Sequence, residues 1–450
     1  MLDTLEARLR EVARAGGIPG ASIAVSVGGE LSEAATGVLN LDTRVEATTG
    51  SLFQVGSTTK VWTAALVMQL VEEGHVELDQ PVRDHLPGFA LADESAAAAV
   101  TVRHLLTHSG GFEGDLFTDT GRGDDSLARY VGLLRDARQI DAPGRSFSYC
   151  NSGFNVLGHL VATLRGGTWE QAMRDHLLTP LGVRQAALMP EEAILFRAAA
   201  GHTPSQETGN PSVVRPWNLP RSNGPAGASL FAAPGELVRF GQMILNGGLA
   251  ADGTRVLSQE SVTAMTGPQF PLPFFPGLGG HWGLGPAVLD WGAPIYWHNG
   301  STLGQAASWW IVPGHDVVVA FTANGGDMAG LVSDLAEPLI TELTGLTPPA
   351  PIRPPATPVR ADLAPYPGRY VTPTMVVDVA ESDGLLEITS TPAGLLATLS
   401  ATPRTARFVP YGGHGFIAVD AVQGRHRFVS FTVEDGRATH VFEGRSAPRA

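Results

Sequence analysis

The sequence predicts an α+β fold in which helices flank an antiparallel sheet, with a small antiparallel β-barrel at the C-terminal end. Three observations carry this prediction. Strand patterns stand near both ends of the first 346 residues, with helical patterns between them. A proline-rich segment follows, and beyond it apolar residues recur with the two-residue period of strands. Strands at the two extremes of a segment, with helices between them, are typical of an α+β layout.

The N-terminal elements can be placed from their apolar spacing. Residues 1–16 predict an amphipathic surface helix, because leucines and a valine recur at helical spacing among charged side chains. Residues 19–28 predict a strand that ends at a glycine pair, and residues 31–38 a second strand that completes a hairpin. Ser57 opens an apolar helix that we expect to end at Gly74.

The middle of the chain mixes short helical patterns with loops rich in glycine and proline. We expect helices at 126–137, 168–178 and 234–245. Strand patterns return late, at 295–298, 307–312 and 317–322. A helix over 330–346 closes this part.

A domain boundary is predicted at residues 347–360, which carry six prolines. Such a density favours an extended, semi-rigid spacer. The sequence therefore predicts a catalytic domain over 1–346 and a β-domain over 361–450. In the latter, Asp383-Gly384 and Asp435-Gly436 stand at the expected hairpin turns.

Charge and composition exclude several classes of partner. The net charge of -14 disfavours nucleic acid and anionic membranes. No apolar run reaches the roughly 20 residues that span a bilayer, and no segment resembles an export signal. One cysteine, Cys150, cannot form an intrachain disulfide. We expect a cytoplasmic protein without a cofactor.

Of the 30 lysines and arginines in the chain, Lys60 is the only lysine. It follows Ser57 by three residues, which on a helix puts both side chains on one face. An arginine stays protonated, whereas a buried lysine can lose its proton and activate a hydroxyl. Base composition explains the arginines, but it does not explain why the remaining lysine stands in Ser-x-x-Lys.

Two further motifs carry groups for the same chemistry. Tyr149 beside a cation could have its phenol pKa depressed and act as a base or proton shuttle, and Asn151 could bind both a substrate carbonyl and the lysine. Cys150 between them is interpreted as a small buried filler rather than a nucleophile. In the segment from His298 to Ser301, Gly300 allows close approach of a ligand.

These three motifs, with the segment Thr101–Phe112, resemble the superfamily of penicillin-binding proteins and serine β-lactamases, closest to its class C, esterase and D-peptidase branch. The resemblance covers roughly residues 5–346. It implies that Ser57 is the acylated nucleophile, with Lys60 and Tyr149 as the proton-handling pair. It further implies that Asn151 contacts the substrate and that the backbone N–H groups of Ser57 and Ser301 form the oxyanion hole.

The third motif departs from the commoner Lys-Thr-Gly, because His298 stands where a permanent cation usually binds a carboxylate. This weakens a β-lactamase interpretation, since a histidine can stay neutral. His104 and His108 stand at the spacing of a zinc pair, but their segment matches the structural stretch of the superfamily. We therefore predict no metal site.

A serine-active domain followed by a β-barrel resembles two groups of enzymes. One comprises D-stereospecific peptidases and esterases with lipocalin-like appendages, and residues 365–370 resemble the first strand of such a domain. The other comprises penicillin-binding-protein-type thioesterases, which release nonribosomal peptides from a carrier protein by head-to-tail cyclisation. Arg437 or Arg445 could reach the cleft, although solvated surface arginines are the simpler interpretation. A non-catalytic module that is acylated without turnover remains a third alternative.

Overall fold

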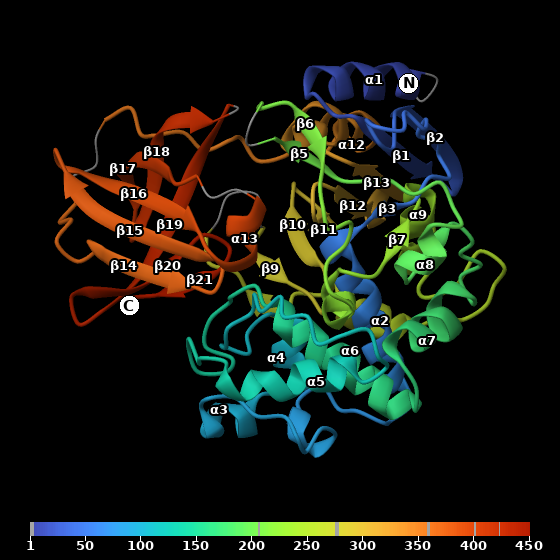
Figure 1. Cartoon of the computed structure of the whole chain (residues 1–450), viewed down its shortest axis with the longest axis horizontal. Helices are drawn as coiled ribbons and strands as arrows, with labels where there is room; N and C mark the ends of the chain where they lie inside the picture. The colour runs from blue at the N-terminus through green and yellow to red at the C-terminus, as the bar shows by residue number, and fades with distance from the viewer. Residues whose placement is uncertain (1–3, 206–207, 275–278, 358–360, 400–401, 423) are drawn as a thin grey trace.

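The structure is a computed structural model that describes residues 4–205, 208–274, 279–357, 361–399, 402–422 and 424–450. Figure 1 shows a sheet with helices on both faces, a mainly helical region below it, and a β-barrel at its side. The predicted α+β class and the C-terminal barrel are confirmed. Within the described residues, no helix is both long and apolar enough to cross a membrane.

The central sheet has eight antiparallel strands in the order β2-β1-β13-β12-β11-β10-β9-β8. The first strand therefore pairs with the last one, from Ala21 opposite Ala323 to Val27 opposite Val317. The bounds are β1 Gly20–Val27, β2 Glu30–Gly37, β8 Phe270–Pro271, β9 His281–Trp282, β10 Ala287–Asp290, β11 Pro294–Ser301, β12 Ala306–Val312 and β13 Val317–Ala323.

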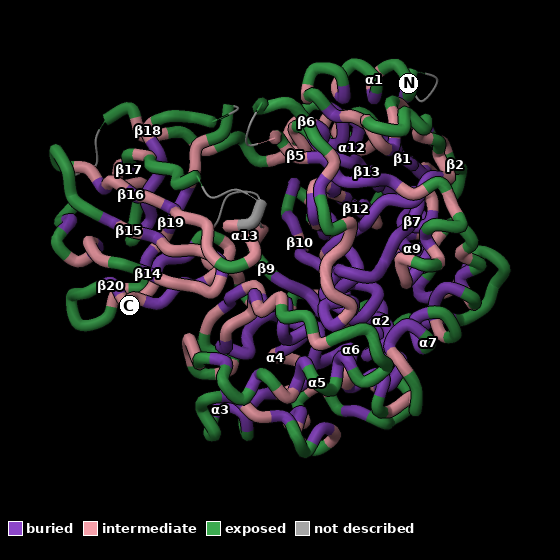
Figure 2. The backbone as a smooth tube through the Cα atoms, viewed as in Figure 1, coloured by how far each residue is buried: buried purple, intermediate pink, exposed green. Residues whose placement is uncertain are grey.

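The two faces of this sheet face separate hydrophobic cores, because successive side chains of a strand point to opposite sides. On β12, Trp309 belongs to the core shared with α2 and α9, whereas Trp310 belongs to the core shared with α1 and α12. Figure 2 shows the buried backbone concentrated in the sheet and in the helices next to it.

The helices begin and end as follows: α1 Leu5–Ala15, α2 Thr59–Glu72, α3 Glu94–Ala99, α4 Val102–Leu106, α5 Ser126–Leu133, α6 Asn151–Arg165, α7 Trp169–Met173, α8 Pro190–Ala193, α9 Pro234–Leu245, α10 Gln259–Thr266, α11 Met328–Leu331, α12 Glu337–Thr344 and α13 Gly394–Leu399. Two smaller sheets join β3 Phe53–Gln54, β7 Phe231–Ala232 and β4 Ala186–Ala187, and β5 His202–Pro204 with β6 Pro211–Val213.

Several predicted helices are interrupted. The helix expected from Ser57 begins as a 3-10 turn over Gly56–Thr58 and becomes α-helical only at Thr59. The helices expected at 168–178 and 330–346 each contain a π-helical segment, Arg174–Leu178 and Val332–Ala336. Periodicity predicts that such a helix exists, but not how its hydrogen bonds are spaced.

The C-terminal barrel is a meander of eight antiparallel strands, nearly closed by a bridge between Tyr370 and Arg449. Both predicted turns have positive φ at their two residues, 53° and 75° at Asp383-Gly384 and 50° and 76° at Asp435-Gly436. The bounds are β14 Gly368–Thr372, β15 Met375–Ser382, β16 Leu385–Pro392, β17 Arg404–Gly412, β18 Gly415–Val422, β19 Arg425–Glu434, β20 Arg437–Phe442 and β21 Ser446–Pro448. The division of the chain into a catalytic domain over 1–346, a linker over 347–360 and a β-domain over 361–450 stays a prediction.

The barrel docks on the segment that leads to Tyr149. The Tyr149 N–H donates to the carbonyl of Gly444 at 3.3 Å, and the Ser446 N–H donates to Ser148 Oγ at 3.1 Å. Phe442 of the barrel packs 6.3 Å from the ring of Phe147 and belongs to the core on the α1 side of the sheet. The barrel is therefore attached close to the motifs that the sequence analysis singled out.

Candidate active site

Ser57 and Lys60 lie together, as their spacing predicts. Lys60 Nζ is 3.0 Å from Ser57 Oγ, 2.7 Å from Asn151 Oδ1 and 2.5 Å from the carbonyl of Ala226. The last two atoms only accept hydrogen bonds. A neutral amine has two N–H groups and one lone pair, so two donations to these acceptors leave the lone pair facing the Ser57 hydroxyl.

Burial favours this neutral form of the amine. Lys60 is fully buried, whereas Ser57 is partly exposed. Desolvation lowers the pKa of Lys60 well below its usual 10.5, and the nearby Arg445 charge lowers it further. A buried base therefore stands behind a hydroxyl that a substrate can reach.

Asn151 is held in one orientation by a residue that the sequence analysis missed. Its Nδ2 donates to Asp115 Oδ1 at 2.6 Å, which leaves its carbonyl oxygen facing Lys60. Asp115 is only 6% exposed and forms an ion pair with Arg445 of the barrel. Arg445 therefore reaches the site through this ion pair, although its side chain is 42% exposed. Arg437 lies exposed on β20.

Tyr149 occupies the expected place but not the expected protonation state. Its ring centroid lies 4.9 Å from Lys60 Nζ and 5.1 Å from the Arg445 guanidinium carbon. Burial nevertheless raises the phenol pKa well above its usual 10, and the Ser57 side chain opposes this only in part. The expectation of a depressed pKa is therefore wrong for the resting enzyme, in which Tyr149 is a neutral phenol.

His298 lies on β11 with 1% of its surface exposed. Burial is the main cause that lowers its pKa to about 3, so the ring is neutral at physiological pH. Its Nδ1 is 2.5 Å from the carbonyl of Asn299, which assigns the proton to Nδ1. Nε2 is then an acceptor, buried and without a hydrogen-bond partner among the residues that the structure describes.

A second histidine, His108, belongs to the same cluster. Its ring stacks on Tyr149 with centroids 4.2 Å apart, and it lies 5.0 Å from the ring of Trp282. Its Nδ1 accepts the N–H of Cys150 at 3.0 Å, which fixes the ring behind the tyrosine. His104 instead caps α4 through Thr101, so the two histidines have separate roles.

Three glycines surround the two predicted oxyanion-hole donors. A Cβ at Gly300 would lie 2.8 Å from the backbone nitrogen of Ser57, and one at Gly227 would lie 2.9 Å from it. A Cβ at Gly56 would lie 2.5 Å from the backbone nitrogen of Ser301. The space beside both N–H groups thus exists only because these positions lack side chains.

Cys150 packs as a structural residue. Its thiol is buried, and burial raises its pKa to about 12, which disfavours the reactive thiolate. Sγ accepts the Gly153 N–H at 3.3 Å and caps the start of α6, the helix that carries Asn151.

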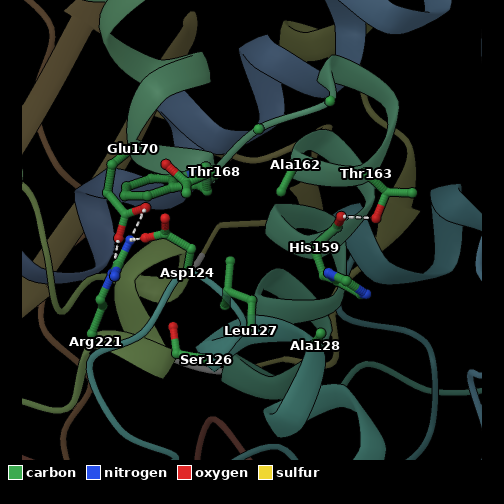
Figure 3. Close-up of a pocket in the computed structure, with 13 residues that line it drawn as sticks. Asp124, Ser126, Leu127, Ala128, His159, Ala162, Thr163, Thr168, Glu170 and Arg221 are labelled. Carbon is green, nitrogen blue, oxygen red and sulfur yellow. Dashed lines mark hydrogen bonds and ion pairs between the residues drawn. The ribbon is translucent and has the colours of Figure 1, made fainter.

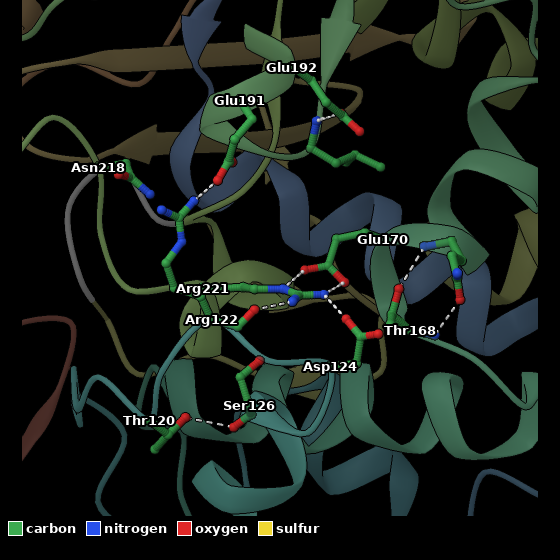
Figure 4. A network of polar contacts seen from close by, with 12 residues as sticks. Thr120, Arg122, Asp124, Ser126, Thr168, Glu170, Glu191, Glu192, Asn218 and Arg221 are labelled. Atoms are coloured by element: carbon green, nitrogen blue, oxygen red, sulfur yellow. Dashed lines mark hydrogen bonds and ion pairs between the residues drawn. The ribbon is translucent and has the colours of Figure 1, made fainter. Parts of the chain in front are cut away.

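A separate cleft of about 270 Å³ lies between α5, α6 and α7 (Figure 3), and Ser57 does not line it. On its wall Arg221 binds Glu170 and Asp124, at 2.8 and 3.1 Å (Figure 4). Arg221 opens the 3-10 segment Arg221–Ala226, whose last carbonyl is the Ala226 acceptor of Lys60. This network anchors the backbone that positions the amine.

Comparison with known proteins defines the class of this chain. The Beta-lactamase family matches residues 3–339, so the chain belongs to that family. It is 45% identical over 356 residues to Penicillin-binding protein 4 of Amycolatopsis lactamdurans, covering 78% of this chain and 93% of that protein. The chain is accordingly a serine hydrolase or acyltransferase, and the predicted superfamily is confirmed.

Solved structures extend the similarity to the barrel. The crystal structure of SurE matches with a TM-score of 0.78 and 26% identity, covering 100% of this chain and 99% of SurE. A class C β-lactamase from Rhodobacter sphaeroides matches with a TM-score of 0.62 and 22% identity, over 76% of this chain and 99% of the other, which shows the shared fold.

Proposed function

We propose that Ser57 is the nucleophile of an acyl-enzyme mechanism, and that the enzyme releases a nonribosomal peptide from its carrier by head-to-tail macrocyclisation. The observation that supports the nucleophile is the buried Lys60 amine, 3.0 Å from Ser57 Oγ and held by two acceptors behind it. The cyclase assignment is supported by the resemblance to penicillin-binding-protein-type thioesterases and by the similarity to SurE over both parts of the chain.

The proposed reaction has two steps, acylation of Ser57 and transfer of the acyl group to the peptide amine. Ser57 Oγ attacks the thioester carbonyl while Lys60 takes its proton. The carbon–sulfur bond then breaks, and Tyr149 relays the proton from Lys60 to the sulfur, which leaves as a thiol. The deprotonated amino terminus of the bound peptide then attacks the ester, and the amide forms as the acyl carbon–oxygen bond to Ser57 breaks. The proton that the amine loses returns to Ser57 Oγ through Tyr149 and Lys60. The N–H groups of Ser57 and Ser301 stabilise the oxyanion of each tetrahedral intermediate.

Substrate binding is proposed to use the groups that line the entrance. Arg445, which is 42% exposed, would bind an acyl-chain carbonyl or carboxylate in place of the cation that His298 replaces. A second structure of SurE was solved with D-Leu, which supports a D-configured residue near the acylated carbonyl. The partner would be an acidic carrier protein that presents the peptidyl thioester; a local basic surface has to offset the net charge of -14.

A hydrolase of D-peptides, esters or lactams is the second candidate. The same Ser57–Lys60 pair serves either reaction, because only the attacking group of the second step differs. Cyclisation wins when the peptide amine is held near the ester and water is kept out.

A peptidyl thioester mimic with a free amino terminus separates these candidates. A cyclic product, lighter than the linear acid by one water, supports the cyclase. Linear acid alone supports the hydrolase, and a stable adduct on Ser57 supports a module that is acylated without turnover. We expect a fluorogenic β-lactam to be turned over slowly, since the third motif lacks its cation.

A further inference from the structure

We propose that Asp115 is a positioning residue that orients Asn151 and thereby Lys60, and that its ion pair with Arg445 makes this arrangement depend on the docked barrel. The inference rests on the proposed chemistry at Ser57. It assigns a task to a buried carboxylate that no sequence motif pointed to.

The first step of the argument concerns the Asn151 amide, which has a donor end and an acceptor end. The Asp115 carboxylate can only accept, and it holds the donor end at 2.6 Å. The acceptor end therefore faces Lys60 Nζ at 2.7 Å. A reversed amide would donate to the lone pair of the amine and so occupy the group that must take the Ser57 proton.

The second step concerns charge. Asp115 is almost fully buried close to Lys60, and a lone carboxylate there would favour the protonated amine, which cannot act as a base. Arg445 pairs with that carboxylate from the barrel, and its own charge disfavours the ammonium. Orientation by Asp115 is thus compatible with a neutral Lys60 only while Arg445 is in place.

The third step concerns how the barrel holds Arg445. On either side of Arg445, the Gly444 carbonyl accepts the Tyr149 N–H and the Ser446 N–H donates to Ser148 Oγ, both in the catalytic part. Thr374, at the turn between β14 and β15, donates to the second oxygen of Asp115 at 3.4 Å. Two separate parts of the barrel therefore meet the same carboxylate.

Other groups around Lys60 are neutral and cannot replace this pair. The groups that face it or act on its charge are the Ser57 hydroxyl, Asn151 and Phe154 of α6, the Ala226 carbonyl, Tyr149, Cys150, His108 and, from β11, His298. Asp115 and Arg445 supply the charges of opposite sign, and their effects on the amine are opposed.

The test measures how fast a neutral fluorophosphonate labels Ser57 across the pH range, by intact-protein mass spectrometry. The rate rises with pH as Lys60 loses its proton, so the midpoint of the curve reports its pKa. A probe without a carboxylate does not need a substrate-binding arginine. If Arg445 only bound substrate, replacing it would therefore leave the curve of labelling rate against pH unchanged.

We expect Arg445→Met to move the midpoint up by about 1 pH unit, because Asp115 is left unpaired. Arg445→Lys should keep the wild-type midpoint. Asp115→Asn should move the midpoint down, and the double variant Asp115→Asn/Arg445→Met should return it towards wild type. Asp115→Ala frees the Asn151 amide, and we expect labelling to slow by up to about 100-fold at every pH.

Arg437→Met is the matched control, since it removes an exposed arginine of the same barrel. Thermal unfolding of each variant identifies one that has not folded. Unchanged midpoints in Arg445→Met and Asp115→Asn, both folded, would overturn the proposal. Absence of labelling at Ser57 in the wild type would instead overturn the proposed acyl-enzyme chemistry, so the two failures are distinguishable.

Discussion

A single amine sets the chemistry at the scale of the residue. Lys60 is fully buried, and two of its three neighbours at hydrogen-bond distance are carbonyl oxygens that cannot donate. The third is the Ser57 hydroxyl, which can. Burial thus lowers the pKa of the amine, and the two acceptors direct its lone pair to the proton that has to move.

Replacing Lys60 by arginine is the first prediction. Lys60→Arg keeps the charge but loses the removable proton, so we expect it to be as inactive as Lys60→Met. The measurement is the rate of Ser57 labelling by the fluorophosphonate, with Ser57→Ala as the unlabelled control. Substantial labelling of Lys60→Arg would show that the residue acts through its charge alone.

The second prediction concerns Cys150. Cys150→Ala should retain most of the activity, because the thiol is buried, its pKa is raised to about 12, and its contacts are structural. We expect a modest loss of thermal stability, since the cap of α6 is removed. Complete loss of labelling in a folded Cys150→Ala protein would implicate the thiol in the reaction.

The third prediction is a pH dependence of stability. His298 has a folded-state pKa of about 3, below its unfolded value of 6.5, so the unfolded chain binds the extra proton between these values. The stability that depends on a neutral His298 is present above pH 6.5 and is lost as pH falls towards 3. Between pH 7 and pH 4 this amounts to about 3 kcal/mol.

Denaturant unfolding of His298→Gln at both pH values checks this. The variant should lose less stability on acidification than the wild type. His75→Gln, at a side chain that is 57% exposed, serves as the control. Equal acid sensitivity of His298→Gln and wild type would contradict a buried neutral imidazole.

Residues close in sequence were predictable, and those that meet only through the fold were not. Ser57 and Lys60 share a face because three residues separate them on a helical turn. Asp115 gave no signal, because its partners lie 36 and 330 residues away, in α6 and in the barrel. The phenol pKa of Tyr149 is raised where the sequence predicts it to be depressed, since burial outweighs the hydrogen bond with Ser57 and the charge of Arg445.

At the scale of the element, the 3-10 turn before α2 and the end of β11 meet through glycines. A Cβ at Gly300 would lie 1.9 Å from the carbonyl oxygen of Val55 and 2.8 Å from the Ser57 nitrogen. Both atoms belong to the backbone, which cannot move aside as a flexible side chain would. The backbone at Ser57 and the backbone at Ser301 therefore lie close together, as the proposed oxyanion hole requires.

The fourth prediction follows from this contact. Gly300→Ala should force the two elements apart and reduce the labelling rate of Ser57 by on the order of 10²- to 10³-fold, the usual effect of losing an oxyanion-hole donor. Gly314→Ala is the control, because a Cβ there meets open space. A folded Gly300→Ala protein that is labelled at the wild-type rate would show that the oxyanion hole lies elsewhere.

Strands proved easier to predict than helix interiors. The strands expected at 307–312 and 317–322 agree with β12 and β13 to within one residue at each end. Their apolar runs are buried on both faces, which makes the pattern strong. The helix expected at 168–178 contains a π segment, because the hydrogen-bond spacing depends on packing that a periodicity does not record.

At the scale of the molecule, the barrel packs against the catalytic part in addition to being connected to it by the proline-rich segment. Phe442 is 6% exposed and packs into the core on the α1 side of the central sheet. Phe442 ends β20, and only Glu443 separates this anchor from Gly444, whose carbonyl accepts the Tyr149 N–H.

Loosening this anchor is the fifth prediction. Phe442→Ala should cost about 3–5 kcal/mol, as for other buried aromatic truncations, and should slow Ser57 labelling by displacing Arg445. Scanning calorimetry should then show the barrel unfolding apart from the rest. Val422→Ala, at an exposed position of β18, is the control. An undisturbed labelling rate in Phe442→Ala would mean that the barrel is dispensable for the nucleophile.

The sequence predicted that a barrel follows the catalytic part, but not where it docks. The proline-rich segment and the two-residue period indicate a separate β-unit. Docking depends on contacts such as Phe442 with Phe147 and Arg445 with Asp115, whose partners are hundreds of residues apart. No local pattern records such a pairing.

The most direct measurement of the central claim uses the fact that the chain has one lysine. Protein labelled with ¹³C and ¹⁵N at lysine gives a single side-chain signal, and its titration reports the pKa of Lys60 without assignment. We predict a midpoint well below 10.5, with a neutral amine at the pH where Ser57 is labelled fastest. A signal that titrates near 10.5, like that of a solvated lysine, would contradict the role of Lys60 as the base.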